Sequence, residues 1–398
     1  MMRTRFTTPA GITLLNAELG NGEVTSLRIV GPRIASLGED PFPGDTVVDL
    51  QGDRVLPGLI NAHDHLQLNS LTRPAFGKSY RHVREWISDV DARRRSDPEF
   101  AAGVAVARDE RLLIGGVKNL LSGVTTVAHH DPFYPFLSSA HFPTGIVRNY
   151  GWSHSLYVDG ETKVSASFRA TPSGWPWIIH AAEGLDDEAV GEFERLEALG
   201  CLRANTVLVH GIALERAQQT RLELAGAGLI WCPSSNLHLF GKTAEVTELA
   251  TRGRVALGTD SRLSGARDLL DELRVAGQIG GLEDRILESL VTCDSARLLR
   301  LPDRGKLRAG ARADILVLPA GTRLAAANRA GVRLVLVGGI VRYGDKDYAQ
   351  RVAQRAAWTE IRVDGKAKIL DIDIAQHLSR AGTGEAGLEL CNVAGRAA

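Results

Sequence analysis

Short apolar segments alternate with helical segments between residues 57 and 302, and this alternation constrains the fold most strongly. The predicted strands read "GLINAH", "GVTTVAHH", "GIVRNYGW", "WPWIIHAAE", "NTVLVHG", "GLIWCPSSN" and "RVALGTDS". Amphipathic segments such as "DEAVGEFERLEALG" and "LERAQQTRLELAGAG" lie between them. Strands joined through helices run parallel, and this many units over roughly 250 residues predict an α/β fold with a (β/α)8 TIM-type barrel.

Both ends of the chain have a different pattern, with short alternating strands and turn signals. "EVTSLRIVGPRIASLG" lies before the barrel segment, and "GVRLVLVGGIVRYGD" lies after it. We therefore predict a small β-sandwich domain from residues 1–56 and 303–345, with the barrel at 57–302 inserted between its halves. Residues 346–398 form a C-terminal extension with one candidate strand, "EIRVDGKAKIL".

The fourth barrel unit is short. Only residues 153–173 separate "GIVRNYGW" from "WPWIIH", whereas a unit of such a barrel averages roughly 30 residues. The sequence predicts either a shortened fourth strand within "KVSASFRA" or an irregular barrel at this point.

Composition restricts the classes of partner. The chain has 47 Lys and Arg against 47 Asp and Glu, without a basic block, so we expect no nucleic-acid partner. It has no apolar segment long enough for a membrane span and no recognisable signal peptide. Four scattered cysteines without C-x-x-C spacing indicate a reduced, cytoplasmic protein. We expect a small-molecule substrate, and assembly as a homodimer is left open.

Polar residues end several of the predicted strands. His63 and His65 are two residues apart, so they share one face of their strand. Such a pair is a weak signal alone, because a short motif can arise by chance. Three later strand ends strengthen it, because the carboxyl ends of barrel strands meet at one mouth. These residues are His180, His210 and Asp260. Histidines and a carboxylate together suit a divalent cation such as Zn²⁺, with Fe²⁺ as the alternative.

The motifs as a set resemble the amidohydrolase superfamily. They are "PGLINAHDH", "GVTTV", "IIHAAEG", "LVHGIAL", "CPSSNLHL", "ALGTDS" and "GKLRAGARADILVL". They occur in the order of that family and cover most of the chain from residue 50 to about 345. The similarity is greatest to the aminohydrolase and chlorohydrolase branch, which includes guanine deaminase, S-adenosylhomocysteine deaminase and the triazine hydrolases.

The resemblance implies a role for each strand-end residue. Glu183, in the H-x-x-E position after His180, corresponds to the general acid and base. His210 corresponds to a histidine that contacts the attacking water or the substrate. Asp260 would also accept the proton of that water. The implied metal ligands are His63, His65, His180 and Asp260. No lysine that could bridge two ions is evident at the fourth strand, so one metal ion is expected.

The implied activity is metal-dependent hydrolysis of a carbon–nitrogen bond. Water activated by the ion would attack a small heterocyclic or amidine-like compound, and ammonia would leave. Two alternatives within this class are the release of chloride or an alkylamine and the opening of a cyclic amide. An alternative from another class is a barrel that binds a ligand without catalysis.

Further residues are candidates for substrate contact. They are Gln67, His130, Arg148 and Trp152. A solvated loop position for Gln67 and ordinary packing in the barrel wall for the others are the competing interpretations. His129 and His130 end the same strand, and only one of them should face the mouth. His154 and His238 are weaker candidates of the same kind.

Overall fold

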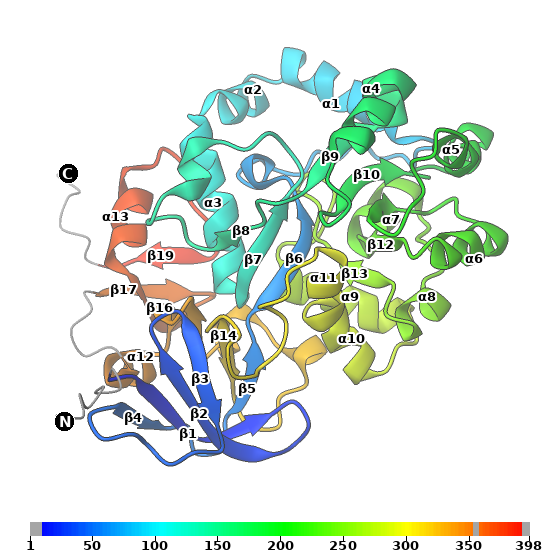
Figure 1. Cartoon of the computed structure of the whole chain (residues 1–398). Helices are drawn as coiled ribbons and strands as arrows, with labels where there is room; N and C mark the ends of the chain where they lie inside the picture. The colour runs from blue at the N-terminus through cyan, green and yellow to red at the C-terminus, as the bar shows by residue number, and fades with distance from the viewer. Residues whose placement is uncertain (1–9, 353–357, 392–398) are drawn as a thin grey trace.

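Strands from both ends of the chain lie in one sheet at the bottom of the molecule (Figure 1). The structure is a computed structural model that describes residues 10–352 and 358–391. The sheet order is β19-β17-β18-β16-β15-β14-β5-β1-β2-β3, with β4 paired to β1. The early strands are β1 (Ile12–Leu19), β2 (Val24–Val30), β3 (Arg33–Leu37), β4 (Thr46–Asp49) and β5 (Arg54–Pro57). The late strands are β14 (Ile315–Leu318), β15 (Leu334–Val337), β16 (Ile340–Gly344), β17 (Trp358–Val363), β18 (Lys366–Asp371) and β19 (Leu388–Leu390).

Eight further strands form two parallel sheets, ordered β6-β7-β8 and β13-β12-β11-β10-β9. They are β6 (Leu59–Asp64), β7 (Val124–His129), β8 (Gly145–Ile146), β9 (Gly151–Ser155), β10 (Trp177–Ala181), β11 (Thr206–His210), β12 (Gly228–Trp231) and β13 (Val255–Leu257). Parallel strand–helix units of the kind that a TIM-type barrel contains are therefore present. The hydrogen-bonded ladders divide the eight strands between two sheets.

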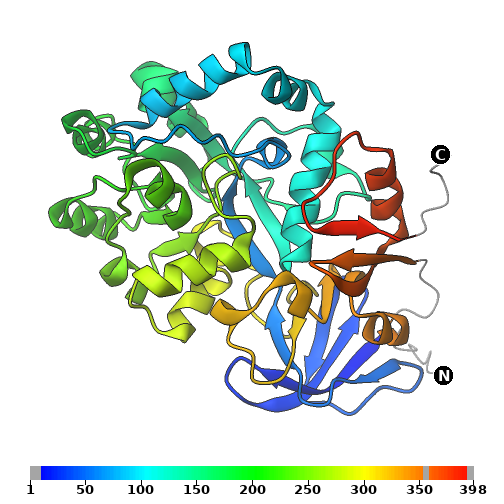
Figure 2. The same ribbon diagram turned by 180° about the vertical axis from the view of Figure 1, so that it is seen from behind.

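Helices surround the parallel strands (Figures 1 and 2). The longer ones are α1 (Val83–Ser96), α2 (Pro98–Ala105), α3 (Arg108–Leu121), α4 (Leu156–Ala170), α5 (Asp187–Ala198), α6 (Arg216–Leu224), α7 (Pro233–Phe240), α9 (Leu269–Ile279) and α13 (Ile372–Arg380). The shorter ones are α8 (Thr247–Thr251), α10 (Asp284–Leu290), α11 (Cys293–Leu298) and α12 (Lys346–Val352). The 3-10 turns are η1 (Leu66–Leu68), η2 (Pro135–Ser138), η3 (Leu324–Ala326) and η4 (Arg329–Gly331).

The parallel strands are covered on both faces. Every residue of β6, β7, β10 and β11 is buried. This explains why these strands are rich in apolar residues rather than alternating between apolar and polar ones. Side chains of the surrounding helices, such as Leu113 of α3 and Phe193 of α5, complete the core.

The short region before β10 differs from both expectations. "GIVRNYGW" is not one strand: β8 and β9 share it, and only residues 147–150 join them. Two α-helices of the barrel pattern are therefore absent from the part of the chain that the structure describes, because only the 3-10 turn η2 lies between β7 and β8 and no helix lies between β8 and β9. "KVSASFRA" is the end of α4 and not a strand. Ser155 caps this helix by accepting a hydrogen bond from the amide of Val158, so the chain turns directly from β9 into α4.

Two hydrogen bonds join the strand ends of the two parallel sheets. The amide of Asp260 donates to the carbonyl of His63 at 3.1 Å. The amide of Thr259 donates to the side-chain oxygen of Asn61, also at 3.1 Å. The segment after β13 is thereby fixed against β6, which brings residues almost 200 positions apart in the chain together.

The C-terminal extension is part of the fold. Its expected single strand is a hairpin of β17 and β18, because Asp364 and Gly365 have φ values of 48° and 79° and form the turn. Glu385 then forms salt bridges of 2.6 Å with both Arg262 and Arg329. The extension is therefore tied to the loop that carries Asp260, and Figure 2 shows it beside α3.

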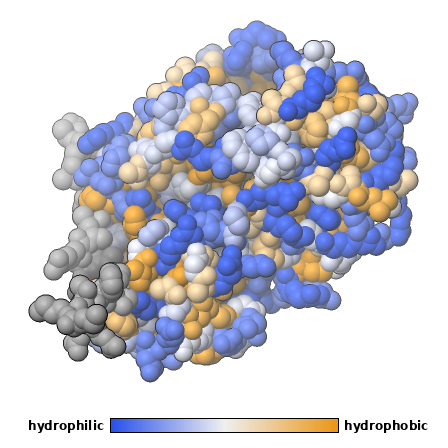
Figure 3. Space-filling view, in the orientation of Figure 1, coloured by the Kyte–Doolittle hydropathy of each residue, from blue (hydrophilic) through white to orange (hydrophobic). Residues whose placement is uncertain are grey.

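The surface is mixed in character. On the face shown in Figure 3, apolar residues are scattered among hydrophilic ones, which is ordinary for a globular protein. Within the described ranges, no helix is both long and apolar enough to cross a membrane.

Candidate active site

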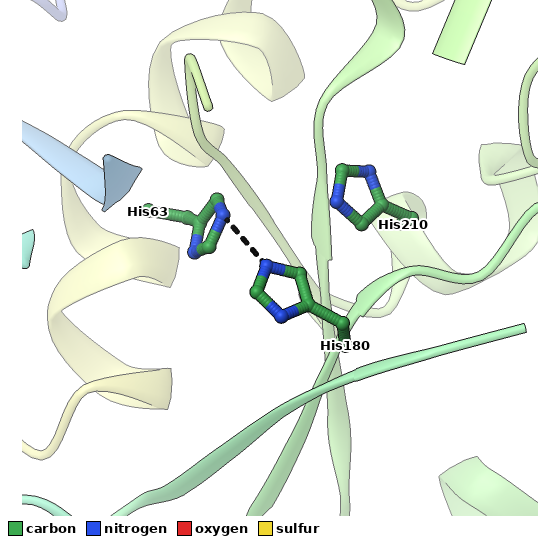
Figure 4. Close-up of side chains that lie close together, drawn as sticks. All are labelled: His63, His180 and His210. Carbon is green, nitrogen blue, oxygen red and sulfur yellow. Dashed lines mark hydrogen bonds between the residues drawn. The ribbon is translucent and has the colours of Figure 1, made fainter. Parts of the chain in front are cut away.

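Histidines from different strands converge at the carboxyl ends of the parallel strands. His63 lies in β6 and His65 directly follows it, while His180 lies in β10 and His210 ends β11. Figure 4 shows the rings of His63, His180 and His210 pointing toward one another. One nitrogen of each of these three rings lies within 4.8 Å of the others. The structure therefore brings together the strand-end histidines that the sequence pattern singled out.

The backbone is strained at these strand ends. His210 has a φ of 75°, Ala182 of 54° and Asp260 of 52°. Left-handed backbone costs a non-glycine residue on the order of 1 kcal/mol or more, and it persists where surrounding structure enforces it. Such residues are concentrated at functional sites. Here they aim His210, Asp260 and the residue after Ala182 toward the same space.

Short distances connect four of the groups. Nε2 of His63 lies 3.3 Å from Nε2 of His180 (dashed line in Figure 4). Oδ1 of Asp260 lies 3.7 Å from Nε2 of His65 and 4.0 Å from Nε2 of His63. All four residues are buried. The atoms that approach one another are therefore three imidazole Nε2 atoms and one carboxylate oxygen.

Outer hydrogen bonds determine which ring nitrogen carries the hydrogen. An oxygen acceptor faces Nδ1 of three of the rings. It is the carbonyl of His154 for His180, the carboxylate of Asp131 for His65, and the amide oxygen of Asn236 for His210, at 2.7, 2.7 and 2.9 Å. These oxygens accept only, so Nδ1 donates and the Nε2 atom of a neutral ring keeps its lone pair. The lone pairs are directed into the site.

Burial keeps most of these rings neutral. Burial and the neighbouring histidines hold the pKa values of His63 and His180 well below the usual value. His65 differs: burial lowers its pKa, but the Asp131 carboxylate outweighs this and raises it to about 9. A cation that binds Nε2 of His65 would have to displace that proton.

Asp260 is oriented by three donors. Its Oδ2 accepts hydrogen bonds from the hydroxyls of Ser235 and Ser264, each at 2.8 Å, and its Oδ1 accepts one from the amide of Ser261 at 2.7 Å. Burial raises its pKa, but His65 and His210 hold the value below the ordinary one. The group is therefore an oriented, ionised carboxylate that faces the imidazoles.

Glu183 and His210 form a pair at the edge of this cluster. Oε1 of Glu183 lies 3.4 Å from Nε2 of His210, and both side chains are buried. Burial raises the pKa of Glu183 well above its usual value, and Asp260 and Glu192 raise it further. Burial lowers the pKa of His210. Both shifts favour the neutral form of each group.

The donor set fits a divalent cation. Imidazole Nε2 atoms and an ionised carboxylate are the ligands that zinc and similar ions prefer. The 3.3 Å contact between the Nε2 atoms of His63 and His180 needs a proton or a cation between two lone-pair sites. We therefore regard this cluster as a candidate metal site, and the Glu183–His210 pair provides a proton donor beside it.

The predicted substrate contacts lie in different environments. Gln67, in η1, donates from Nε2 to Asp131 at 2.8 Å, and its buried Oε1 has no hydrogen-bond partner among the described residues. Trp152, in β9, is half-buried with its ring 5.4 Å from that of His130. Arg148 lies in the β8–β9 connection, where it is exposed and bonds to the hydroxyl of Ser138. His238, in α7, is exposed.

The two histidines that end β7 separate as the strand pattern required. His130 is buried beside His63 and His180. His129 faces the other way, and its Nδ1 accepts a hydrogen bond from the amide of Leu66. His154 stacks obliquely on His180 with ring centroids 4.7 Å apart, and its backbone carbonyl is the acceptor described above.

Sequence reasoning missed the residues that orient the histidines and Asp260. They are Asp131, Ser235, Asn236 and Ser264. Two signals could have indicated them. Asp131 directly follows a strand that ends in two histidines, and Ser235 and Asn236 lie in the "CPSSN" motif at the end of another strand.

Comparison of the sequence with known proteins finds a family profile and several deaminases that are similar to this chain. The profile of the amidohydrolase family matches residues 163–342. A 5-methylthioadenosine/S-adenosylhomocysteine deaminase of Natronomonas pharaonis is 28% identical over 330 residues, covering 70% of this chain and 76% of that enzyme. An 8-oxoguanine deaminase of Pseudomonas aeruginosa is 26% identical, covering 96% of this chain and 99% of that enzyme.

Solved structures show the same fold. The zinc complex of atrazine chlorohydrolase from Arthrobacter aurescens superimposes with a TM-score of 0.66 at 20% identity, covering 83% of this chain and 94% of that one. An adenosine deaminase from Xanthomonas campestris with bound zinc gives a TM-score of 0.70 at 17% identity, covering 87% and 97%. At these identities the likeness concerns the fold alone.

Proposed function

We propose that this chain, an amidohydrolase relative by motif, sequence and fold, is a metal-dependent deaminase of a small heterocyclic or amidine-like compound. One observation carries the proposal. The buried carboxyl of Glu183 lies 3.4 Å from His210, beside imidazoles whose Nε2 atoms converge with the carboxylate of Asp260. This arrangement combines a cation site with a proton donor in one buried space.

We assign the metal to His63, His65, His180 and Asp260, and we propose a single Zn²⁺, with Fe²⁺ as the alternative. Three imidazoles and one carboxylate match the preference of zinc. β9 reads "GWSHS" and contains no lysine that could bridge a second ion. His210 is left outside this ligand set, because its Nε2 contacts Glu183.

The residues divide the chemistry between them. A bound divalent cation supplies an activated water by lowering the pKa of that water from about 16 toward about 7. Asp260 can accept its proton, since the carboxylate is ionised and its Oδ2 is held by Ser235 and Ser264. Glu183 can deliver one proton to a ring nitrogen, and the proton that Asp260 takes from the water can then protonate the departing amine. His210 orients Glu183 and contacts the reacting centre.

The site favours an amine as the leaving group. An amine must be protonated before it leaves, and the raised pKa of Glu183 supplies a proton at neutral pH. The relatives named above include deaminases of adenosine derivatives and of 8-oxoguanine. The likeness to a chlorohydrolase keeps release of chloride as the second candidate, and that reaction needs no protonated glutamate.

We also propose that residues 57–302 form the catalytic unit and that both chain ends support it. Every residue assigned a role above lies within this range. The salt bridges of Glu385 with Arg262 and Arg329 support a structural role for the C-terminal extension, because Arg262 follows Asp260 by two positions.

Ammonia release tests the proposal. Zinc-loaded protein is incubated with amino-substituted purines, pyrimidines and pterins, and with matched chloro analogues. We expect ammonia from at least one amine. Glu183→Gln should reduce kcat by about 10²–10⁴-fold while the zinc content stays unchanged. Turnover of chloro compounds alone, or full activity in the Gln variant, would contradict deamination.

A further inference from the structure

The end of β7 contacts both histidines of the first strand from behind. His130 reaches His63, and Asp131 reaches His65. We propose that His130 and Asp131 are positioning residues that hold His63 and His65 through Nδ1, which fixes the tautomer of His63 and directs both Nε2 atoms into the site. The inference deepens the proposed function and rests on the cation site assigned there.

His130 is enclosed by protein. Its ring is 2% exposed and stacks on His180 with centroids 4.4 Å apart and planes at 18°. The edge of Trp152 covers it at 5.4 Å. An imidazolium would lose its hydration in this position, so the neutral ring is strongly favoured. Because the ring is so enclosed, we do not assign it to substrate contact.

The partners of His130 then determine its tautomer. Its Nε2 lies 3.0 Å from the backbone carbonyl of Ser153, which only accepts, so Nε2 carries the hydrogen. The Nδ1 atom of the neutral ring is therefore an acceptor. It lies 3.3 Å from Nδ1 of His63, so His63 donates from Nδ1. Nε2 of His63 is left bare, 3.3 Å from Nε2 of His180.

The opposite tautomer of His63 would close the site. A hydrogen on Nε2 of His63 would point at His180 and occupy the position that a cation needs. It would also leave two lone pairs facing each other between His63 and His130. The imidazole–imidazole contact therefore selects the form of His63 that binds metal.

Asp131 acts on His65 in the same way. Its Oδ2 accepts from Nδ1 of His65 at 2.7 Å and from the amide of Gln67 at 2.8 Å. A carboxylate at Nδ1 fixes the ring and makes the opposite nitrogen a stronger donor to a metal. Gln67 holds the carboxylate, so its amide has a positioning role as well.

The pairing of β6 with β7 determines where His130 and Asp131 lie. β6 and β7 pair in parallel, and the amide of His130 donates to the carbonyl of Asp64, the residue between the two histidines, at 3.1 Å. His130 and Asp131, which directly follow β7, thus lie beside His63 and His65. The register fixes which residue orients which imidazole.

A matched pair of variants tests His130. The side-chain oxygen of His130→Asn can occupy the position of Nδ1 and still accept from His63. His130→Gln places its amide near the position of Nε2, where it can donate to Ser153 but offers His63 no acceptor. We expect His130→Asn to bind zinc within about 3-fold of the wild type and His130→Gln to bind it about 10–100-fold more weakly.

Zinc affinity is measured by competition with a chromophoric chelator, and the visible spectrum of the Co²⁺ form reports the ligand geometry. Equal losses in both variants would indicate packing alone and would overturn the tautomer argument. Wild-type affinity in His130→Gln would also overturn it. A raised KM with normal zinc affinity would make His130 a substrate contact and would overturn the positioning role.

A second pair of variants tests Asp131. Asp131→Asn keeps an acceptor for His65 without the charge, and Asp131→Leu removes the acceptor. We expect a loss of zinc affinity of about 10-fold for Asn and about 100-fold for Leu. Equal affinities in both variants and the wild type would overturn the role of Asp131. These readouts need no substrate, so they can fail while deamination stands, and a wild-type protein that binds no divalent ion would overturn both proposals.

Discussion

The two faces of β6 differ in how their buried polar groups are satisfied. His63 and His65 lie on one face of the strand end, and Asp64 lies on the other. All three residues are buried. The polar atoms of Asp64 all have partners within the protein, whereas on the face of the histidines Nε2 of His63 lies opposite Nε2 of His180.

Asp64 is surrounded by donors. Its oxygens accept from Lys118 at 3.2 Å, Asn119 at 2.8 Å and Asn69 at 2.7 Å. Lys118 also donates to the side-chain oxygens of Asn69 and Thr259 at 2.8 and 3.1 Å. Each charge has an opposite charge and hydrogen bonds, which is the condition for burial of an ion pair. This network needs no ligand and reads as structural.

The histidine face lacks such a complete set of hydrogen-bond partners. Each ring has a partner for Nδ1, and the Nε2 atoms are directed at one another and at Asp260. A folded protein avoids buried lone pairs that face each other unless something lies between them. The comparison teaches that a binding site differs from a structural network in whether its buried polar atoms have hydrogen-bond partners within the protein. Burial and polarity are the same in both.

The largest expected effect is on the histidine face. The side-chain amide of His180→Asn can still donate to the carbonyl of His154, but the variant has no atom at the position of Nε2. We expect the zinc content to fall to background and turnover to fall by more than about 10³-fold. The unfolding free energy of the metal-free protein should change by no more than about 1–2 kcal/mol. Elemental analysis and urea unfolding measure the two quantities.

A variant that retained zinc and activity would remove His180 from the ligand set. One that unfolded without metal would show that the histidine face is structural, and the contrast between the two faces would fail.

The opposite result is expected on the face of Asp64. Lys118→Met leaves a buried carboxylate without its cation, which costs about 3–5 kcal/mol of stability. Urea unfolding of the metal-free protein measures the loss. Asp64→Leu combined with Lys118→Met removes both charges and should be less destabilising than Lys118→Met alone. Equal losses in the single and double variants would show that the pair makes no net electrostatic contribution.

The smallest effect concerns a buried carboxyl that is only partly satisfied. Glu192 accepts one hydrogen bond, from the amide of Ala182 at 2.7 Å, and burial raises its pKa to about 7. The folded protein therefore holds a proton that the unfolded chain releases, so stability falls as the pH rises from about 4.5 to about 7. Glu192→Gln keeps the acceptor without the charge and should remove a loss of up to about 3 kcal/mol.

Urea unfolding of zinc-loaded protein from pH 5 to pH 8 checks this prediction. The two proteins should be similar at pH 5, and the variant should be the more stable at pH 8. If the unfolding free energies of the two proteins changed in parallel with pH, the carboxylate of Glu192 would be stabilised by protein partners, as that of Asp64 is.

The sequence predicted the parallel units and the meeting of the strand-end residues because both depend on local periodicity. Side chains two positions apart share a face of a strand, and this holds for His63 and His65 in any sheet. Parallel strands end at one edge, which brings His180 and Asp260 to the same place. Where the local signal was ambiguous, the prediction failed: "KVSASFRA" is helical, and "GIVRNYGW" contains two strands.

Only the tertiary structure decided how each imidazole is held. Asp131 lies 66 residues from His65 in the chain, and Asn236 lies 26 residues from His210. No periodicity relates such positions, because their contacts depend on the register between strands and on the paths of loops. The sequence by itself determined which side chains meet. The fold determined which nitrogen of each ring is free to bind, because a hydrogen bond from the far side of the ring fixes its tautomer.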